Sequence, residues 1–214
     1  MNKIGRIALL LACTSFFLHA QDSNRFNFDV GGGVGIPIGN TSDLAGVSGN
    51  VVVGGGVNLT PAFGFNGEFM WHGLPPTNDV LHAISVTDAT ASLYSLTGNF
   101  IGRIGAHRRF GAYVIGGGGW YRRSWKVSAP ALVPGTVCGP SFSWFGVTCV
   151  NGLVPASFVL ADGSINGGGW NIGGGLTFGH EGPGMRIYTE VRYHKAYFSN
   201  FDTEVLPVTF GFRW

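Results

Sequence analysis

The chain has 214 residues, of which 14% are aromatic and only 11% are charged, whereas soluble domains carry about 25% charged residues. Its 13 basic and 11 acidic residues give a formal net charge of +2, which provides no basic face and excludes nucleic-acid binding as the expected function. Beyond the N-terminal segment no run approaches about 18 consecutive apolar residues, so we expect no helical membrane span.

Residues 1–20, MNKIGRIALLLACTSFFLHA, predict a cleaved secretion signal. Lys3 and Arg6 precede an apolar run that is shorter than the about 20 residues of a spanning helix, and Ala20 ends the segment on a small residue. The letters LLAC ending at Cys13 resemble a lipoprotein box, but cleavage there would leave an apolar run of only about six residues. We therefore expect an exported mature chain, residues 21–214, that forms one domain with a net charge near zero.

Eight segments of the mature chain place apolar residues at every second position, which is typical of β-strands with one apolar face. In the fifth segment both faces carry large residues, so the pattern leaves open which face points inward. The segments are 26–38, 50–59, 63–73, 92–100, 113–125, 169–178, 186–197 and 205–214.

The connections between these segments alternate in length. Short turns are expected at 60–64, 102–110 and 180–185, and longer loops at 39–49, 74–89, 128–164 and 199–204. Strands of about 10–12 residues can cross a bilayer when tilted, and short turns opposite long loops are typical of outer-membrane barrels. A soluble sandwich or lipocalin-like barrel is the alternative, but it would need more charge to coat its exterior.

The last strand ends on alternating apolar residues and a terminal aromatic residue: Val208, Phe210, Phe212 and Trp214. This ending resembles the C-terminal signal that the β-barrel assembly machinery reads. The pattern over 21–214 is similar to that of the small eight-stranded outer-membrane β-barrel family that includes OmpA and OmpX. The resemblance implies an all-β, eight-stranded antiparallel transmembrane β-barrel with short periplasmic turns and longer extracellular loops.

The same resemblance implies a location in the outer membrane of a Gram-negative-type bacterium, with membrane lipid and lipopolysaccharide as partners. It implies a monomer without a soluble periplasmic domain. Val208, Phe210 and Phe212 would face lipid, and Trp214 would lie at the periplasmic interface.

Glycine runs occur at 31–33, 54–56, 116–119, 167–169 and 173–175. The letters GGGVG partly match a dinucleotide-binding fingerprint, but that motif must lead into a helix, and here Pro37 and strand residues follow. In a narrow barrel we expect these glycines to allow tight curvature and to leave small water-filled pockets.

The polar face of the strands carries ionisable residues that must pair if the lumen buries them. They support two interpretations, a salt-bridged core that fills the lumen or a narrow polar pathway through it. His72 and His194 share this face, but they lack a metal-ligand spacing, and we expect neither a metal nor another cofactor. The charged set comprises Asp29, Glu68, Glu190, Arg192 and Arg213.

Cys138 and Cys149 lie in the longest expected loop, and an exported chain favours a disulfide between them, worth roughly 2–3 kcal/mol. Such a bond would present Phe142, Trp144 and Phe145 to an external ligand, or the loop would fold back and pack these aromatics on the rim. Both interpretations stay open.

Three further sets are weaker candidates. Basic residues in the 102–110 turn could meet anionic headgroups, and Arg122, Arg123 and Lys126 could contact lipopolysaccharide phosphates. Residues around the second long loop carry no recognisable catalytic motif, so we expect no enzyme. The turn set is Arg103, His107, Arg108 and Arg109, and the catalytic set is His72, His82, Ser85 and Asp88.

The sequence thus favours a structural or interaction protein that displays its loops outside the cell. A low-conductance passive pore for small solutes or ions is the alternative, and a lipid-modifying barrel enzyme is a weaker one.

Overall fold

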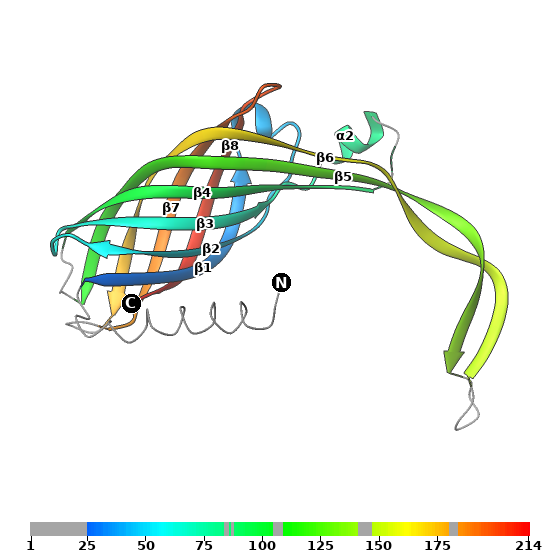
Figure 1. Cartoon of the computed structure of the whole chain (residues 1–214), viewed down its shortest axis with the longest axis horizontal. Coiled ribbons are helices and arrows are strands. Elements are labelled where there is room, and N and C mark those ends of the chain that lie inside the picture. The colour runs from blue at the N-terminus through cyan, green and yellow to red at the C-terminus, as the bar shows by residue number, and fades with distance from the viewer. Residues whose placement is uncertain (1–24, 84–85, 87, 105–108, 141–146, 180–183) are drawn as a thin grey trace, which may run out of the picture.

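The computed structural model describes residues 25–83, 86, 88–104, 109–140, 147–179 and 184–214. Eight antiparallel strands form one closed barrel in sequence order, with β1 paired to β8 (Figure 1). The fold class expected from the sequence is therefore confirmed. The expected secretion signal, residues 1–20, lies outside the described residues.

All eight expected strand segments fall within observed strands, apart from one or two residues at some ends. A short 3-10 helix, η1 (Gly39–Thr41), follows β1, and a helix, α2 (Asn78–Ala83), precedes β4. The strands are β1 (Phe26–Pro37), β2 (Ser48–Asn58), β3 (Phe63–Gly73), β4 (Asp88–Ile104), β5 (Phe110–Pro140), β6 (Val147–Gly179), β7 (Arg186–Tyr197) and β8 (Thr203–Arg213).

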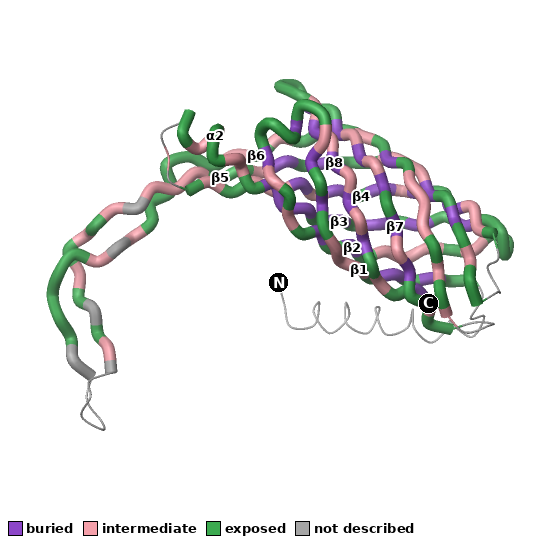
Figure 2. The backbone as a smooth tube through the Cα atoms, turned by 180° about the vertical axis from the view of Figure 1, so that it is seen from behind, coloured by how far each residue is buried: buried purple, intermediate pink, exposed green. Residues whose placement is uncertain are grey.

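Buried and exposed residues alternate along the strands (Figure 2). In β8, Phe210 and Phe212 are exposed on the exterior, while Thr209 and Arg213 beside them are buried in the lumen. Trp214 exchanges two backbone hydrogen bonds with Phe28, of 2.7 and 2.9 Å. The barrel thus presents its apolar residues outward and its polar residues inward, the reverse of a soluble domain.

The structure resolves the phase of the fifth strand. Tyr113, Tyr121 and Arg123 point into the lumen, and Trp120 and Arg122 lie on the exterior. The sequence pattern left this open because tyrosine and arginine inside are as large as tryptophan and arginine outside.

The expectation of a loop at 128–164 was wrong. β5 and β6 have 31 and 33 residues and stay paired from Phe110↔Phe178 to Pro140↔Val147, with one irregularity at Val127/Ser128. β4 accompanies β5 only as far as Ser128, and β7 accompanies β6 only from Gly168. Beyond those points each strand has one open edge, and prolines are tolerated there because their missing N–H faces no partner strand.

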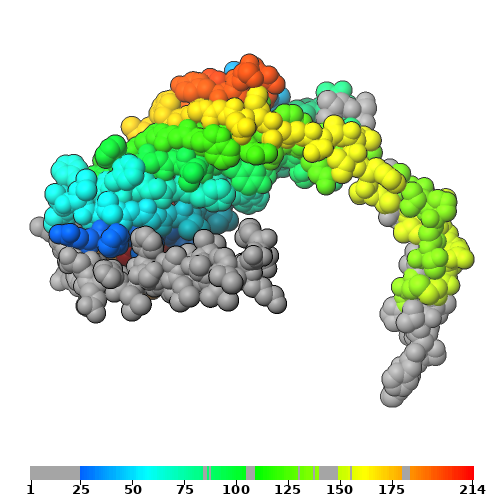
Figure 3. Space-filling model, viewed as in Figure 1, coloured from blue at the N-terminus to red at the C-terminus, as the bar shows by residue number. Residues whose placement is uncertain are grey.

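We call this two-stranded extension, residues 129–140 and 147–163, the ribbon. It continues past the end of the barrel and curves to one side, separate from the barrel body (Figures 1 and 3). Four prolines and several glycines made this stretch resemble a loop in sequence, although its valines, cysteines and aromatic residues favour strand.

Three other connections gather at the same end of the barrel, which we call the long-connection end. Ala45 in the β1–β2 connection bridges to Pro76 in the β3–β4 connection, and the Gly46 N–H donates to the Pro75 carbonyl at 2.8 Å. The β8 backbone joins them, because the Glu204 N–H donates to Thr41 Oγ1 at 2.9 Å. These hydrogen bonds hold the connections together across the barrel end.

Inward-facing glycines lie beside large lumen side chains. A Cβ on Gly169 would lie 2.8 Å from the Tyr121 ring, and one on Gly175 would lie 2.6 Å from the Tyr113 ring. The pockets expected beside glycines are at these two positions filled by tyrosine rings. The glycines therefore make room for interior side chains as well as for curvature.

Within one glycine run, Gly169→Ala and Gly168→Ala should behave differently. A Cβ at 169 would also come within 2.9 Å of the Ala196 Cα, whereas a Cβ at Gly168 meets nothing within 4 Å. We expect Gly169→Ala to lower the free energy of unfolding by about 1–3 kcal/mol and Gly168→Ala to change it by less than about 0.5 kcal/mol. Guanidinium unfolding in lipid vesicles, followed by tryptophan fluorescence, measures both, and equal effects would contradict this packing.

Candidate functional site

Arg192 lies at the centre of a charged network in the lumen. Its guanidinium contacts Glu68 on β3 and Glu190, which lies on β7 together with Arg192. All three side chains are at most 6% exposed. Glu68 also accepts hydrogen bonds from Asn66 Nδ2 at 3.1 Å and from Asn99 Nδ2 at 2.7 Å. Neutral amide N–H groups thus donate hydrogen bonds to a buried carboxylate.

Arg213 and Asp29 extend this network toward the end of the barrel where β1 begins. The Arg213 guanidinium lies 4.8 and 4.9 Å from the ring centres of Tyr113 and Tyr188, and its Nε lies 3.9 Å from Asp29 Oδ1. Asp29 accepts a hydrogen bond from Asn66 Nδ2 at 2.7 Å.

The Tyr113 hydroxyl donates to Glu190 at 2.8 Å and so links the two parts of the network. The structure therefore brings Asp29, Glu68, Glu190, Arg192 and Arg213 into one layer. Sequence reasoning missed the neutral members of that layer. Asn66 and Asn99 share the inward phase and could have been included, whereas Tyr113 lay in the strand of unresolved phase.

A second polar layer lies on the side of the long-connection end. The Tyr121 hydroxyl hydrogen-bonds His194 Nδ1 at 3.0 Å, and Thr209 Oγ1 donates to Asn50 Oδ1 at 3.1 Å. His72 is buried against Gly35, where any Cβ would collide with the imidazole ring. Among the described residues, no group of three or more His, Cys, Asp or Glu side chains could hold a metal ion.

An apolar cluster follows at the long-connection end. Each member is at most 8% exposed, and Arg123 lies nearby with its guanidinium 3.9 Å from the Phe201 ring centre and 4.8 Å from that of Phe198. Sequence reasoning missed the cluster because three of its members, Ala45, Leu74 and Phe198, come from connections. The cluster comprises Ala45, Leu74, Leu93, Tyr121, Ala196, Phe198 and Val205.

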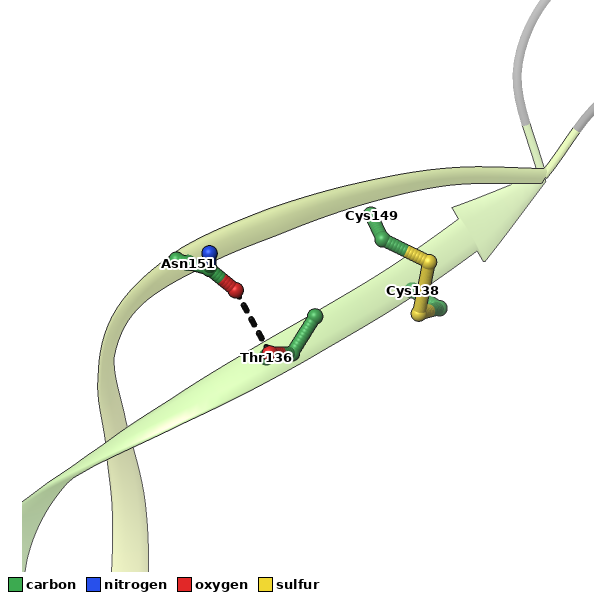
Figure 4. Close-up of a disulfide and its surroundings, with 4 residues drawn as sticks. All are labelled: Thr136, Cys138, Cys149 and Asn151. Carbon is green, nitrogen blue, oxygen red and sulfur yellow. Dashed lines mark hydrogen bonds between the residues drawn. A yellow bond between two sulfur atoms is a disulfide. The ribbon is translucent and has the colours of Figure 1, made fainter.

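The ribbon carries the Cys138–Cys149 disulfide that the sequence predicted, between residues that lie directly opposite each other (Figure 4). Next to it, Thr136 Oγ1 donates to Asn151 Oδ1 at 2.6 Å across the two strands. The three aromatic candidates, Phe142, Trp144 and Phe145, lie outside the described residues.

The basic residues that the sequence grouped together lie in different surroundings. Arg122 is exposed and donates to Ser164 Oγ at 2.8 Å, and Lys126 is exposed as well. Arg123 instead turns inward and donates to Thr203 Oγ1 at 3.0 Å, so its grouping with the other two was wrong. In the 102–110 turn, Arg103 donates to Asn58 Oδ1 at 2.7 Å and Arg109 is exposed, whereas His107 and Arg108 lie outside the described residues.

The weak catalytic set does not assemble in the described structure. His72 is buried in the lumen, whereas His82 on α2 and Asp88 at the start of β4 are exposed. Ser85 lies outside the described residues.

Replacing Arg192 should destabilise the barrel strongly, because it removes the cation that contacts both Glu68 and Glu190. We expect Arg192→Met to lower the free energy of unfolding by about 3–5 kcal/mol. The matched control is Lys195→Met, which breaks a partly exposed 2.8 Å pair with Glu204 at the rim and should destabilise the barrel far less than Arg192→Met. Equilibrium unfolding in lipid vesicles measures both, and similar losses would show that the lumen network is not a buried ionic core.

No helix among the described residues is long and apolar enough to cross a membrane. No curated protein sequence shows a significant match to the chain.

Solved structures of outer-membrane and surface proteins share the fold at low sequence identity. Neisserial surface protein A is 9% identical, with a TM-score of 0.55 over 88% of this chain and 95% of its own. A major outer membrane protein from Thermus thermophilus is 10% identical, with a TM-score of 0.51 over 88% and 98%. Ail, the attachment invasion locus protein of Yersinia pestis, solved with the heparin analogue sucrose octasulfate, is 15% identical, with a TM-score of 0.50 over 89% and 98%.

These likenesses show the fold, and the family follows from the sequence itself. The family model of the outer membrane protein beta-barrel domain matches residues 8–213, which is nearly the whole chain. The alternation of apolar exterior and polar lumen agrees with that match. The chain belongs to the outer membrane protein beta-barrel domain family and is a protein of the Gram-negative outer membrane.

Proposed function

We propose that the protein is a sealed structural barrel that anchors the β5–β6 ribbon and displays it to a partner outside the cell. The observation that supports a blocked lumen is the succession of a charged layer, a second polar layer and an apolar cluster along the barrel. A barrel blocked in this way is suited to holding a projecting element rather than to passing solutes.

The orientation belongs to the proposal. Short turns face the periplasm and long connections face outward in barrels of this kind, which would place the ribbon outside the cell. The exterior residues would contact membrane lipid, and Arg122 and Lys126 would lie near lipopolysaccharide phosphates. A signal at 1–20 would direct export, and the assembly machinery would read Val208, Phe210, Phe212 and Trp214. The closed sheet leaves no barrel strand in need of a partner, which supports a monomer.

The ligand in the Ail structure is a heparin analogue, sucrose octasulfate. The ribbon of this chain offers no cation to such a ligand, because no Lys or Arg occurs between residues 127 and 161. We therefore expect a partner that is recognised without charge pairing.

A low-conductance pore is the second candidate. The observation that favours it is a set of buried lumen atoms without a hydrogen-bond partner, among them both ring nitrogens of His72 and both terminal nitrogens of Arg213. Waters at such atoms would form part of a polar path. A lipid-modifying enzyme is weaker, since the described residues bring no nucleophile and base together at either rim.

Refolded residues 21–214 should be electrically silent in planar bilayers, and so should Arg213→Ala. On this proposal the apolar cluster blocks the long-connection end without help from the charged layer, so the loss of one arginine should leave the barrel blocked. Single-channel recording tests this, with the heat-dependent gel mobility of each protein as the folding control. Steady conductance steps that change in Arg213→Ala would replace this proposal with the pore.

The ribbon should also be accessible on intact cells. Cys138 and Cys149 are the only cysteines of the expected mature chain, and they lie on the projecting ribbon, so they provide a native probe. After mild reduction, a membrane-impermeant maleimide should label them equally in intact and in broken cells. Labelling that requires broken cells would place the ribbon in the periplasm and refute the proposed orientation.

A further inference from the structure

The ribbon carries a single charged residue, Asp162, close to the barrel. The 35 residues 127–161 contain no Asp, Glu, Lys, Arg or His, and they are bounded by Lys126 and Asp162. Exposed segments in water normally carry charge, and large exposed apolar surfaces mark sites of contact with another molecule or with a membrane. The surface of the ribbon therefore requires an explanation beyond its projection from the barrel.

Apolar side chains are exposed on both faces of the ribbon. Leu132 and Leu153 lie on one face, because Leu153 pairs with Pro134, and they are 62% and 64% exposed. Val150 and Phe158 lie on the other face, because they pair with Val137 and Ala129, and they are 63% and 49% exposed. A flat protein partner would cover only one of these two faces.

The polar groups on the inner edge of each ribbon strand are paired with the other ribbon strand. The Thr136 hydroxyl donates to the Asn151 side-chain oxygen at 2.6 Å, and backbone pairing runs the whole length to Pro140↔Val147. Pro130, Pro134 and Pro155 have no N–H, so they reduce the number of unpaired donors on the two open edges. The same prolines oppose the addition of another strand at those edges.

From these observations we infer that the ribbon binds lipid, by inserting into the phospholipid bilayer of another membrane held against the cell. The inference rests on the proposed function, which places the ribbon outside the cell, and it specifies the partner. Lipid covers both faces at once, and a surface without charged side chains avoids the cost of moving a charge into lipid. A second copy of the chain would leave one apolar face in water.

The depth of insertion is limited by the open edges. Carbonyl groups along both edges remain without strand partners, and such groups are costly in hydrocarbon. The ribbon therefore enters the headgroup region and the outer hydrocarbon layer without crossing the bilayer. The cell's own lipopolysaccharide surface fits less well, because its phosphates attract cations and residues 127–161 carry none.

The test uses residues 21–214 held in lipid nanodiscs and mixed with phosphatidylcholine vesicles. Flotation should carry the wild-type protein with the vesicles to the same extent at low and at high salt. Leu132→Asp combined with Leu153→Asp should weaken this binding by about a hundredfold or more, because each aspartate must leave water. Leu132→Ile combined with Leu153→Ile is the matched control and should bind like the wild type.

Three results would overturn the inference: wild-type protein that stays out of the vesicle fraction, aspartate variants that float as well as the wild type, or association of nanodiscs with one another in place of vesicle binding. Gel mobility verifies that every variant retains the barrel. If the protein does not bind vesicles but its ribbon is labelled on intact cells, lipid is excluded as the partner and the display function still stands. A ribbon that cannot be labelled on cells would remove the display function itself.

Discussion

The hydrogen bonds between β1 and β8 close the sheet, and the other features of the barrel depend on that closure. The two strands pair from Asp29↔Arg213 to Pro37↔Val205, so neither leaves an edge in the membrane, where unpaired backbone groups are very costly. Closing only eight strands gives a narrow lumen with room for side chains alone. Glycines therefore face the rings of Tyr113 and Tyr121, and the five inward charges lie close enough to compensate one another.

The two ends of the barrel differ in the side chains that they bury. Near the start of β1 the lumen holds the charged layer, which joins four of the eight strands through ion pairs. The long-connection end holds an apolar cluster and the joined β1–β2 and β3–β4 connections, and β5 and β6 continue beyond it alone. A closed barrel thus carries one long projecting element, and this division between anchor and projection is the basis of the proposed function.

Much of this architecture follows from local patterns in the sequence. The alternation in segments such as 26–38 and 205–214 predicts both strands and the outward position of residues such as Phe28 and Phe210. The phase of β5 did not follow, because Tyr121 and Arg123 inside are as bulky as Trp120 and Arg122 outside. The extent of the β5–β6 ribbon could not be predicted, because a proline on an open strand edge cannot be distinguished from a proline in a loop by sequence alone. The contact of Glu68 with Arg192 depends on the stagger of the closed barrel, and no single segment encodes that stagger.

The position of this contact also has a consequence for the time course of folding. Glu68 lies on β3 and Arg192 on β7, four strands apart in an eight-stranded ring, so the two side chains approach from opposite walls. They can meet only after the sheet has curled far enough to bring β3 and β7 opposite each other. Interactions that form after the transition state slow unfolding with little influence on the rate of folding. The central ion pair therefore acts chiefly on the lifetime of the folded barrel in the membrane and contributes little to the speed of its assembly.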